Sequence, residues 1–401
     1  MSGPMQGIKV VEMGVWVAGP AAGGILADWG ADVVKIEPPG VGDPGRTFAR
    51  MLGGDLPFNP PFEMDNRGKR SVILDLGRSE GRELALELID GADVFISNMR
   101  QTALARLGLD PVPLLKRNPR LVYGAISGYG FDGVDADKAA YDIAAYWARG
   151  GVAGALSPPG EAPPFQRGGM GDHAAGLSLA GGISAALFAR ERNGRGQLVS
   201  TSLLRQGIYT LAFDLSIVLR FGVNLGAADR TKMPNPSVNS YCDKEGRWFW
   251  IVGLDGDRHW PPLARAIGHP EWIDDPRFAT VADRAANASE LIARLDEIFA
   301  TRTRNEWGAI FDAEQDLWWA PVQTPTEVVA DPQARACGGW VDVPDGEATT
   351  TLPATPVDFE GTPWAPRSMA PEHGQHGDEI LRELGRTDAE IEALRKSGAL
   401  G

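Results

Sequence analysis

The chain has 401 residues, more than a single hydrophobic core usually supports, so two domains are expected. Its 53 acidic residues outnumber its 39 basic residues, which gives a formal net charge of −14 at pH 7. This charge argues against nucleic acid or an anionic membrane as a partner, and a polyanionic ligand would have to bind a local basic cluster. Two cysteines are too few for a disulfide framework or a cysteine-based zinc site. No signal peptide is predicted, and a cytoplasmic location is expected.

The N-terminal part of the chain alternates predicted strands with predicted helices. Residues 7–13 (GIKVVEM) form a short apolar run typical of a buried parallel strand. Residues 32–37 (DVVKIE) form a second strand after a glycine-containing turn and a small-residue helix. This order predicts a βαβ unit of the doubly wound type. The glycine spacing differs from G-x-G-x-x-G, so neither NAD nor a flavin is expected.

The alternation continues through three further predicted strands, at residues 66–76, 94–97 and 121–128, with helices between them. It predicts a parallel sheet with helices on both faces. The first of these segments begins NRGKR, a local positive patch that is either an anion site or a solvated turn. Residues 203–222 are apolar but interrupted by charged residues, which predicts a buried helix rather than a membrane span.

The character of the sequence changes after residue 222. Residues 223–239 are irregular and resemble a linker, and residues 240–335 begin with a predicted β-hairpin followed by helices. Residues 336–401 contain a second linker-like stretch and a closing pair of helices. The predicted organisation is a large α/β domain over residues 1–222, a linker, a small α+β domain and a C-terminal segment.

A lone carboxylate, Asp172, follows a group of glycines at the start of a predicted helix over residues 168–192. Unpaired backbone N–H groups and the helix dipole favour the ionised carboxylate at such a position. Asp is also a common N-cap residue, so this position alone does not distinguish a helix cap from a reactive group.

Three segments together resemble the family III CoA-transferases, the group that contains formyl-CoA and carnitine CoA-transferases. They are GIKVVEMGVWVAGPAAGGILADWGADVVKIEPP, NRGKRSVILDL and GDHAAGLSLAGGISAALFARERNGRGQ. The later blocks DPRFAT, APVQTPTEVVADPQ and HGDEILRELG also match the family pattern. The resemblance therefore spans nearly the whole chain. The α-methylacyl-CoA racemases share the same fold.

The resemblance implies a Rossmann-like large domain completed by the C-terminal segment, a smaller α+β domain, and a homodimer of two interlocked chains. It also implies that coenzyme A binds as a substrate across the large domain, without a metal or NAD. The CoA contacts implied by the family pattern are Val17, Ala18, Lys69, Asn98, Met99, Ala103, Arg106 and Lys138. The chain departs from the pattern at Pro38, where some relatives have a basic residue, and at residues 231–239, where formyl-CoA transferase has a glycine-rich loop.

By the same resemblance, Asp172 is the nucleophile of a CoA transfer from an acyl-CoA to a free carboxylic acid. The implied intermediates are an aspartyl anhydride and an aspartyl-CoA thioester.

Two alternatives remain at this point. A racemase of this fold uses a His directly before the acid at the position of Asp142, but Tyr141 stands there, and a phenol is a poor base at neutral pH. His173 adjoins Asp172 in sequence, yet successive helical residues diverge by about 100°, so a shared function is not expected. The second alternative, a non-catalytic CoA-binding protein, would have no need of Asp172.

Overall fold

The computed structural model describes residues 3–47, 59–158 and 160–401. It divides into two compact units. The first unit consists of Met1–Ala155, Pro164–Asn224 and Arg335–Gly401, and the second of Leu156–Pro163 and Leu225–Ala334. Both ends of the chain therefore belong to the first unit. No helix in the described ranges is long and apolar enough to span a bilayer.

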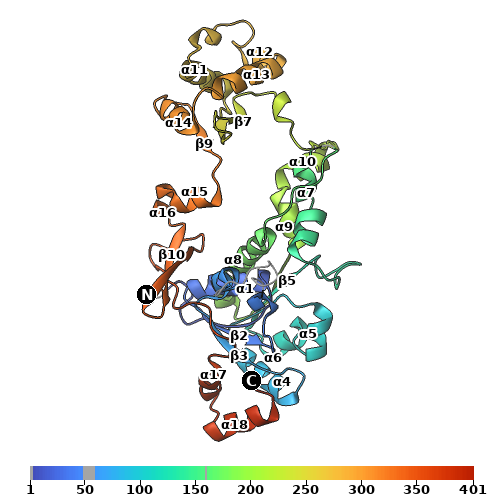
Figure 1. Cartoon of the computed structure of the whole chain (residues 1–401). Coiled ribbons are helices and arrows are strands. Elements are labelled where there is room, and N and C mark those ends of the chain that lie inside the picture. The colour runs from blue at the N-terminus through green and yellow to red at the C-terminus, as the bar shows by residue number, and fades with distance from the viewer. Residues whose placement is uncertain (1–2, 48–58, 159) are drawn as a thin grey trace. The chain divides into compact units, whose positions relative to one another are not determined.

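The first unit is built on a six-stranded parallel sheet with the order β3-β2-β1-β4-β5-β6 (Figure 1). Its central strands are nearly continuous apolar runs because helices cover both faces of a parallel sheet. The sheet confirms the predicted mixed α/β class. The strands are β1 Lys9–Met13, β2 Asp32–Glu37, β3 Arg70–Ile73, β4 Val94–Ser97, β5 Val122–Ser127 and β6 Leu198–Ser202.

The strand order reverses at β1. In the ladder, Val11 of β1 pairs with Val34 of β2 on one side and with Phe95 of β4 on the other. The chain therefore crosses from β1 to β2 in one direction and later passes back to β4 in the other. In open sheets of this kind, ligands bind in the crevice at the carboxyl ends of the strands where the order reverses.

Helices of the first unit pack closely where glycine allows it. Gly176 is an example, because a Cβ there would lie only 2.8 Å from the Cβ of Ala21 on the facing helix. The helical segments are α1 Ala18–Asp28, η1 Pro44–Thr47, α3 Pro60–Asn66, α4 Ser79–Asp90, α5 Gln101–Leu107, α6 Pro111–Arg117, the π-helix η2 Ile143–Arg149, α7 Val152–Leu156, α8 Met170–Asn193, α9 Leu203–Thr210 and α10 Ala212–Phe221.

The expected single buried helix over residues 203–222 is wrong in two respects. It breaks at Leu211, whose backbone leaves helical geometry, and none of the residues of α10 is buried within the chain. Several apolar residues of α10 are instead exposed, namely Phe213, Val218, Leu219 and Phe221.

The C-terminal segment returns to the edge of the sheet at β3. Ser71 O accepts a hydrogen bond from His376 N–H, and Asp75 N–H donates to Ala399 O. In Figure 1 the red helix α17 accordingly lies beside β3. The elements of this segment are the hairpin strands β10 Trp340–Asp345 and β11 Ala348–Pro353 and the helices α17 Gly377–Glu383 and α18 Asp388–Ser397.

The second unit has its own core around a small antiparallel sheet with the order β7-β8-β9. Strand β8 reads WFWIV, and its alternate residues Phe249 and Ile251 are buried in an aromatic-rich cluster. The predicted β-hairpin is confirmed by the β7–β8 pair. The elements are η3 Arg230–Lys232, β7 Val238–Cys242, β8 Trp248–Val252, α11 Gly256–Ala266, η4 Pro270–Ile273, α12 Val281–Ala286, α13 Ala288–Phe299, α14 Arg304–Asp312, β9 Trp319–Pro321 and α15 Pro325–Ala330, with α16 Pro332–Ala336 at the junction to the first unit.

Candidate active site

A cavity of about 470 Å³ lies at the carboxyl ends of β1, β4 and β5. This is the place where the strand order reverses, so the position agrees with the general rule for ligand sites in open sheets. The described residues that line it are Val15, Trp16, Ala18, Asn98, Met99, Arg100, Ala103, Ile126, Ser127, Gly128, Ala139, Ala140, Tyr141, Asp142, Ala144, Asp172 and Leu203.

Asp172 lines this cavity from the first turn of α8. The N-cap of α8 is Gly169, whose φ of 79° places it in the left-handed region, and Asp172 is the third helical residue. The N-cap position is therefore occupied by Gly169 and not by Asp172, so the N-cap interpretation does not describe Asp172. Burial and, secondly, the neighbouring charge of Asp142 raise the pKa of Asp172 to about 7.

Asp142 does not belong to α8 but accepts a hydrogen bond from its first turn. Its Oδ2 accepts a hydrogen bond of 3.0 Å from the N–H of Gly171, one of the donors that a helix start leaves unpaired. Its Oδ1 is buried without a hydrogen-bond partner among the described residues. A Cβ at Gly171 would lie 2.2 Å from that oxygen, so glycine is required for the carboxylate to reach the helix. Two carboxylates therefore share one cavity.

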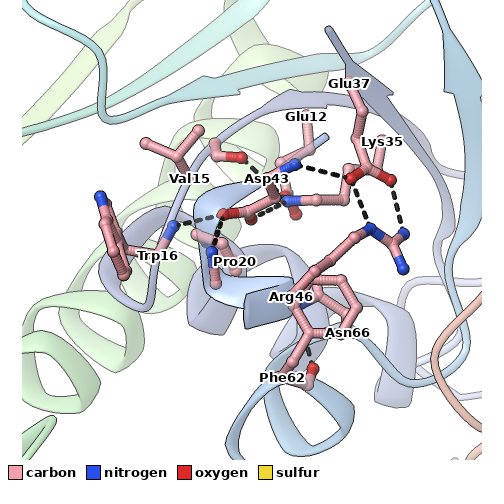
Figure 2. Close-up of polar contacts among 12 residues, drawn as sticks. Glu12, Val15, Trp16, Pro20, Lys35, Glu37, Asp43, Arg46, Phe62 and Asn66 are labelled. Atoms are coloured by element: carbon pink, nitrogen blue, oxygen red, sulfur yellow. Dashed lines mark hydrogen bonds and ion pairs between the residues drawn. The ribbon is translucent and has the colours of Figure 1, made fainter. Parts of the chain in front are cut away.

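The loop between β1 and α1 forms another wall of the cavity. Asn98, directly after β4, accepts a hydrogen bond from Val15 N–H at 2.9 Å and donates one to Val15 O at 2.8 Å. Asp43 accepts a hydrogen bond from Trp16 N–H at 2.9 Å (Figure 2). The amide of Asn98 therefore positions this loop.

A buried ionic network contacts the same loop through Lys35 and Asp43. Lys35 Nζ lies 2.9 Å from Glu12 Oε1 and 2.9 Å from Asp43 Oδ2, and it donates to Gly14 O at 2.8 Å (Figure 2). Lys69 Nζ lies 2.6 Å from Glu12 Oε2. All four side chains are fully buried.

The position of Lys69 differs from the expectation that it lines the CoA groove. Its ammonium also donates to Pro20 O and Asn66 Oδ1, so Lys69 is used within the protein and is absent from the described cavity wall. Of the three cations in the NRGKR segment, Lys69 is therefore part of the buried network around Glu12 and not of a solvated turn. The sequence placed Lys69 before a strand, but it did not indicate that the ammonium of Lys69 would pair with Glu12 of β1.

The other expected CoA contacts fall into two groups. Ala18, Asn98, Met99 and Ala103 line the cavity. Val17, Arg106 and Lys138 do not: Val17 borders a small neighbouring cavity, and the two cations are exposed.

Arg106 and Lys138 lie near acidic side chains. Asp137 has a lowered pKa, first through hydrogen bonds from Thr102 and then through the charges of Arg100 and Arg106. Lys138 Nζ is 4.0 Å from Asp135 and lies over the ring of Tyr129. Arg100 also lines the cavity, and it was not among the residues that the family pattern implied.

His173 points away from Asp172, as the helical offset predicts. Its Nε2 lies 3.1 Å from Asp65 Oδ1 of α3, and it lines a separate cavity. The hydrogen bond with Asp65 raises the pKa of His173, which favours the protonated imidazolium. His173 is therefore unsuited to be the base of a racemase at Asp172.

The cavity, its carboxylate and the strand order can be compared with known proteins. The family model described as CoA-transferase family III matches residues 5–377. This chain belongs to CoA-transferase family III. The resemblance seen in the sequence motifs is confirmed, and with it the prediction of an enzyme of the CoA-transferase class.

Relatives of this family III member are similar over almost their full length. The cinnamoyl-CoA:phenyllactate CoA-transferase of Clostridium sporogenes is 32% identical, with 98% of this chain and 96% of the relative covered. The succinate–glutarate CoA-transferase of Agrobacterium fabrum is 33% identical, with 95% and 96% covered. The crystal structure of a CAIB/BAIF family protein from Brucella suis has a TM-score of 0.83 at 32% identity, over 96% of this chain and 100% of that one.

Proposed function

We propose that the protein transfers CoA from an acyl-CoA to a free carboxylic acid, with Asp172 as the nucleophile. The observation that carries the proposal is a partly buried carboxylate in the cavity where the sheet order reverses, in a chain of the CoA-transferase family. Transfer by an Asp172→Asn variant is the deciding measurement.

The proposed chemistry exchanges one acyl bond for another. Ionised Asp172 attacks the thioester carbonyl, expels CoA thiolate and forms a mixed aspartyl anhydride. The thiolate attacks the aspartyl carbonyl, which releases the first acid as a carboxylate and leaves an aspartyl-CoA thioester. An incoming carboxylate repeats the two steps in reverse, and Asp172 is regenerated. Because a thioester is present at the start and at the end, the exchange requires no ATP and no change of oxidation state.

Asp142 has a positioning role in this proposal. Its hydrogen bond to Gly171 N–H fixes the first turn of α8, and its charge raises the pKa of Asp172. A carboxylate with a raised pKa is a stronger nucleophile when it is ionised, and this ionisation then falls near neutral pH.

We further propose that CoA enters along Ala18, Asn98, Met99 and Ala103, with its phosphates near Arg100, Arg106 and Lys138. Lys and Arg bind phosphate through charge-assisted hydrogen bonds. Support comes from the cavity wall and from the three cations on neighbouring segments.

Arg106→Ala should weaken CoA binding by about 1–3 kcal/mol, the range for a hydrogen bond to a charged group. Titration calorimetry with CoA measures this change. Arg117→Ala is the matched control, because Arg117 is an exposed arginine at the end of α6 and pairs with Asp90 of α4. Equal affinities of both variants and the native protein would refute the phosphate assignment.

We also propose that two chains form the interlocked homodimer that the family resemblance implies, and that α10 is covered in it. Phe213, Leu219 and Phe221 are 78%, 87% and 72% exposed, an unusual display of large apolar side chains on one helix. Light scattering should find a dimer at micromolar concentration, and Phe213→Glu together with Leu219→Glu should shift it toward monomer. A native protein that is monomeric at that concentration would contradict the proposal.

A further inference from the structure

Two aromatic side chains, Trp16 and Tyr141, line the same cavity as Asp172. The chemistry of CoA transfer does not require either of them. Building on the proposed function, we infer that the transferred acid is a monocarboxylate with a large apolar group, and that Trp16 and Tyr141 recognise this group. Trp16 is then a residue that determines substrate specificity.

The two rings form one surface. Their centroids are 5.8 Å apart with an interplanar angle of 87°, an edge-to-face contact between segments that are distant in sequence. Both line the cavity, and Tyr141 remains 64% exposed. An apolar group that packs against this surface removes aromatic area from water, which is the main source of affinity for apolar ligands.

The aromatic surface lies next to the proposed nucleophile. Tyr141 directly precedes Asp142, whose Oδ2 holds the N–H of Gly171, the residue before Asp172. The loop of Trp16 also approaches the start of α8, because a Cβ at Gly169 would lie 3.7 Å from the side chain of Val17. The group attached to a reacting acyl carbon at Asp172 therefore has this surface within reach.

The backbone holds Trp16 in an unfavourable conformation. Its φ is 64°, in the left-handed region that a bulky residue rarely adopts. Such strain persists only where the surroundings enforce it, and it concentrates at functional sites. Here Asp43 accepts a hydrogen bond from Trp16 N–H (Figure 2). Asn98 bonds both backbone groups of Val15, and Lys35 donates to Gly14 O. Asp43 is thus a positioning residue for the Trp16 ring.

The charges of the cavity argue against a second carboxylate on the acid. Among the described residues of the wall, the charged side chains are Arg100, Asp142 and Asp172. Asp142 and Asp172 already repel each other, and Arg100 lies at the start of α5 near Asp137. A dicarboxylic acyl group would bring another negative charge to the two aspartates, whereas an apolar group would not.

Binding to a transfer-inactive protein isolates this inference from catalysis. In the Asp172→Asn background, calorimetry with 3-phenylpropionyl-CoA, succinyl-CoA and CoA gives three dissociation constants. We expect 3-phenylpropionyl-CoA to bind at least about tenfold more tightly than succinyl-CoA, within the range that apolar pocket contacts supply. Adding Trp16→Ala should remove most of this preference, and adding Trp16→Phe should retain a large part of it. CoA itself should bind each variant within about threefold, which shows an intact site.

A matched control is Phe188→Ala, which removes an exposed aromatic ring from α8 outside the cavity and should leave the preference unchanged. Equal binding of the two thioesters would overturn the inference, as would a Trp16→Ala protein that loses affinity for CoA and both thioesters alike. Either result leaves the proposed transfer standing, since transfer is measured separately with the native enzyme.

Discussion

Asp172→Asn should lower CoA transfer by several orders of magnitude and leave the protein folded. The amide cannot form the anhydride, whereas its size and shape match the carboxylate. The N-cap of α8 is Gly169, so replacing Asp172 does not remove the N-cap residue. Removing a carboxylate whose pKa is raised should also leave stability unchanged or higher at pH 8, because burial and Asp142 disfavour the charge in the folded state. Transfer assays and melting temperatures test both parts.

Asp214→Asn is a matched control, because Asp214 is the third residue of α10 as Asp172 is the third residue of α8. It should transfer CoA at the native rate. An Asp172→Asn protein with near-native transfer would end the proposed mechanism.

The same assay across pH gives a second readout of Asp172. Native transfer should decrease as pH falls through about 7, because the raised pKa means that Asp172 gains a proton there and ceases to be a nucleophile. If transfer decreased only near pH 4, the ordinary pKa range of an aspartate, the pKa of Asp172 would not be raised, and the buried environment described for it would be wrong.

Lys35→Met should destabilise the first unit strongly, by about 3–5 kcal/mol, the usual cost of removing one partner from a buried ion pair. The substitution leaves Glu12 and Asp43 without their shared cation, and both are fully buried. The loss should be present at neutral pH, because the charges of Lys35 and Lys69 lower the pKa of Glu12 in spite of its burial and keep it ionised there. Urea unfolding followed by circular dichroism measures it.

Lys396→Met provides the comparison, since Lys396 is 75% exposed and pairs with Glu392 on the surface. Such a pair contributes about 0–1 kcal/mol, so this variant should unfold at nearly the native urea concentration. If Lys35→Met unfolded at the same urea concentration as Lys396→Met, the ionic network would not stabilise the β1–α1 loop. The positive φ of Trp16 would then need another explanation.

Much of the fold was determined by local sequence pattern. Short apolar runs such as GIKVVEM and VFIS predicted strands of a parallel sheet, because only a strand covered on both faces is apolar at successive positions. The glycines before Asp172 predicted a helix start, and α8 begins at Met170. Joint motifs also identified the family, which the family model confirms.

Other features were decided only by the tertiary structure. Charge pattern made Lys69 look like an anion ligand, but parallel strand packing brings it to Glu12 in the interior. Nothing in the sequence around Asp142 indicated that its carboxylate reaches across to Gly171, which is possible because Gly171 has no Cβ. The wall formed by Trp16 and Tyr141 joins residues far apart in the chain. Periodicity records which residues are buried, whereas the partner of a buried charge or ring depends on strand order and on the close approach of separate segments.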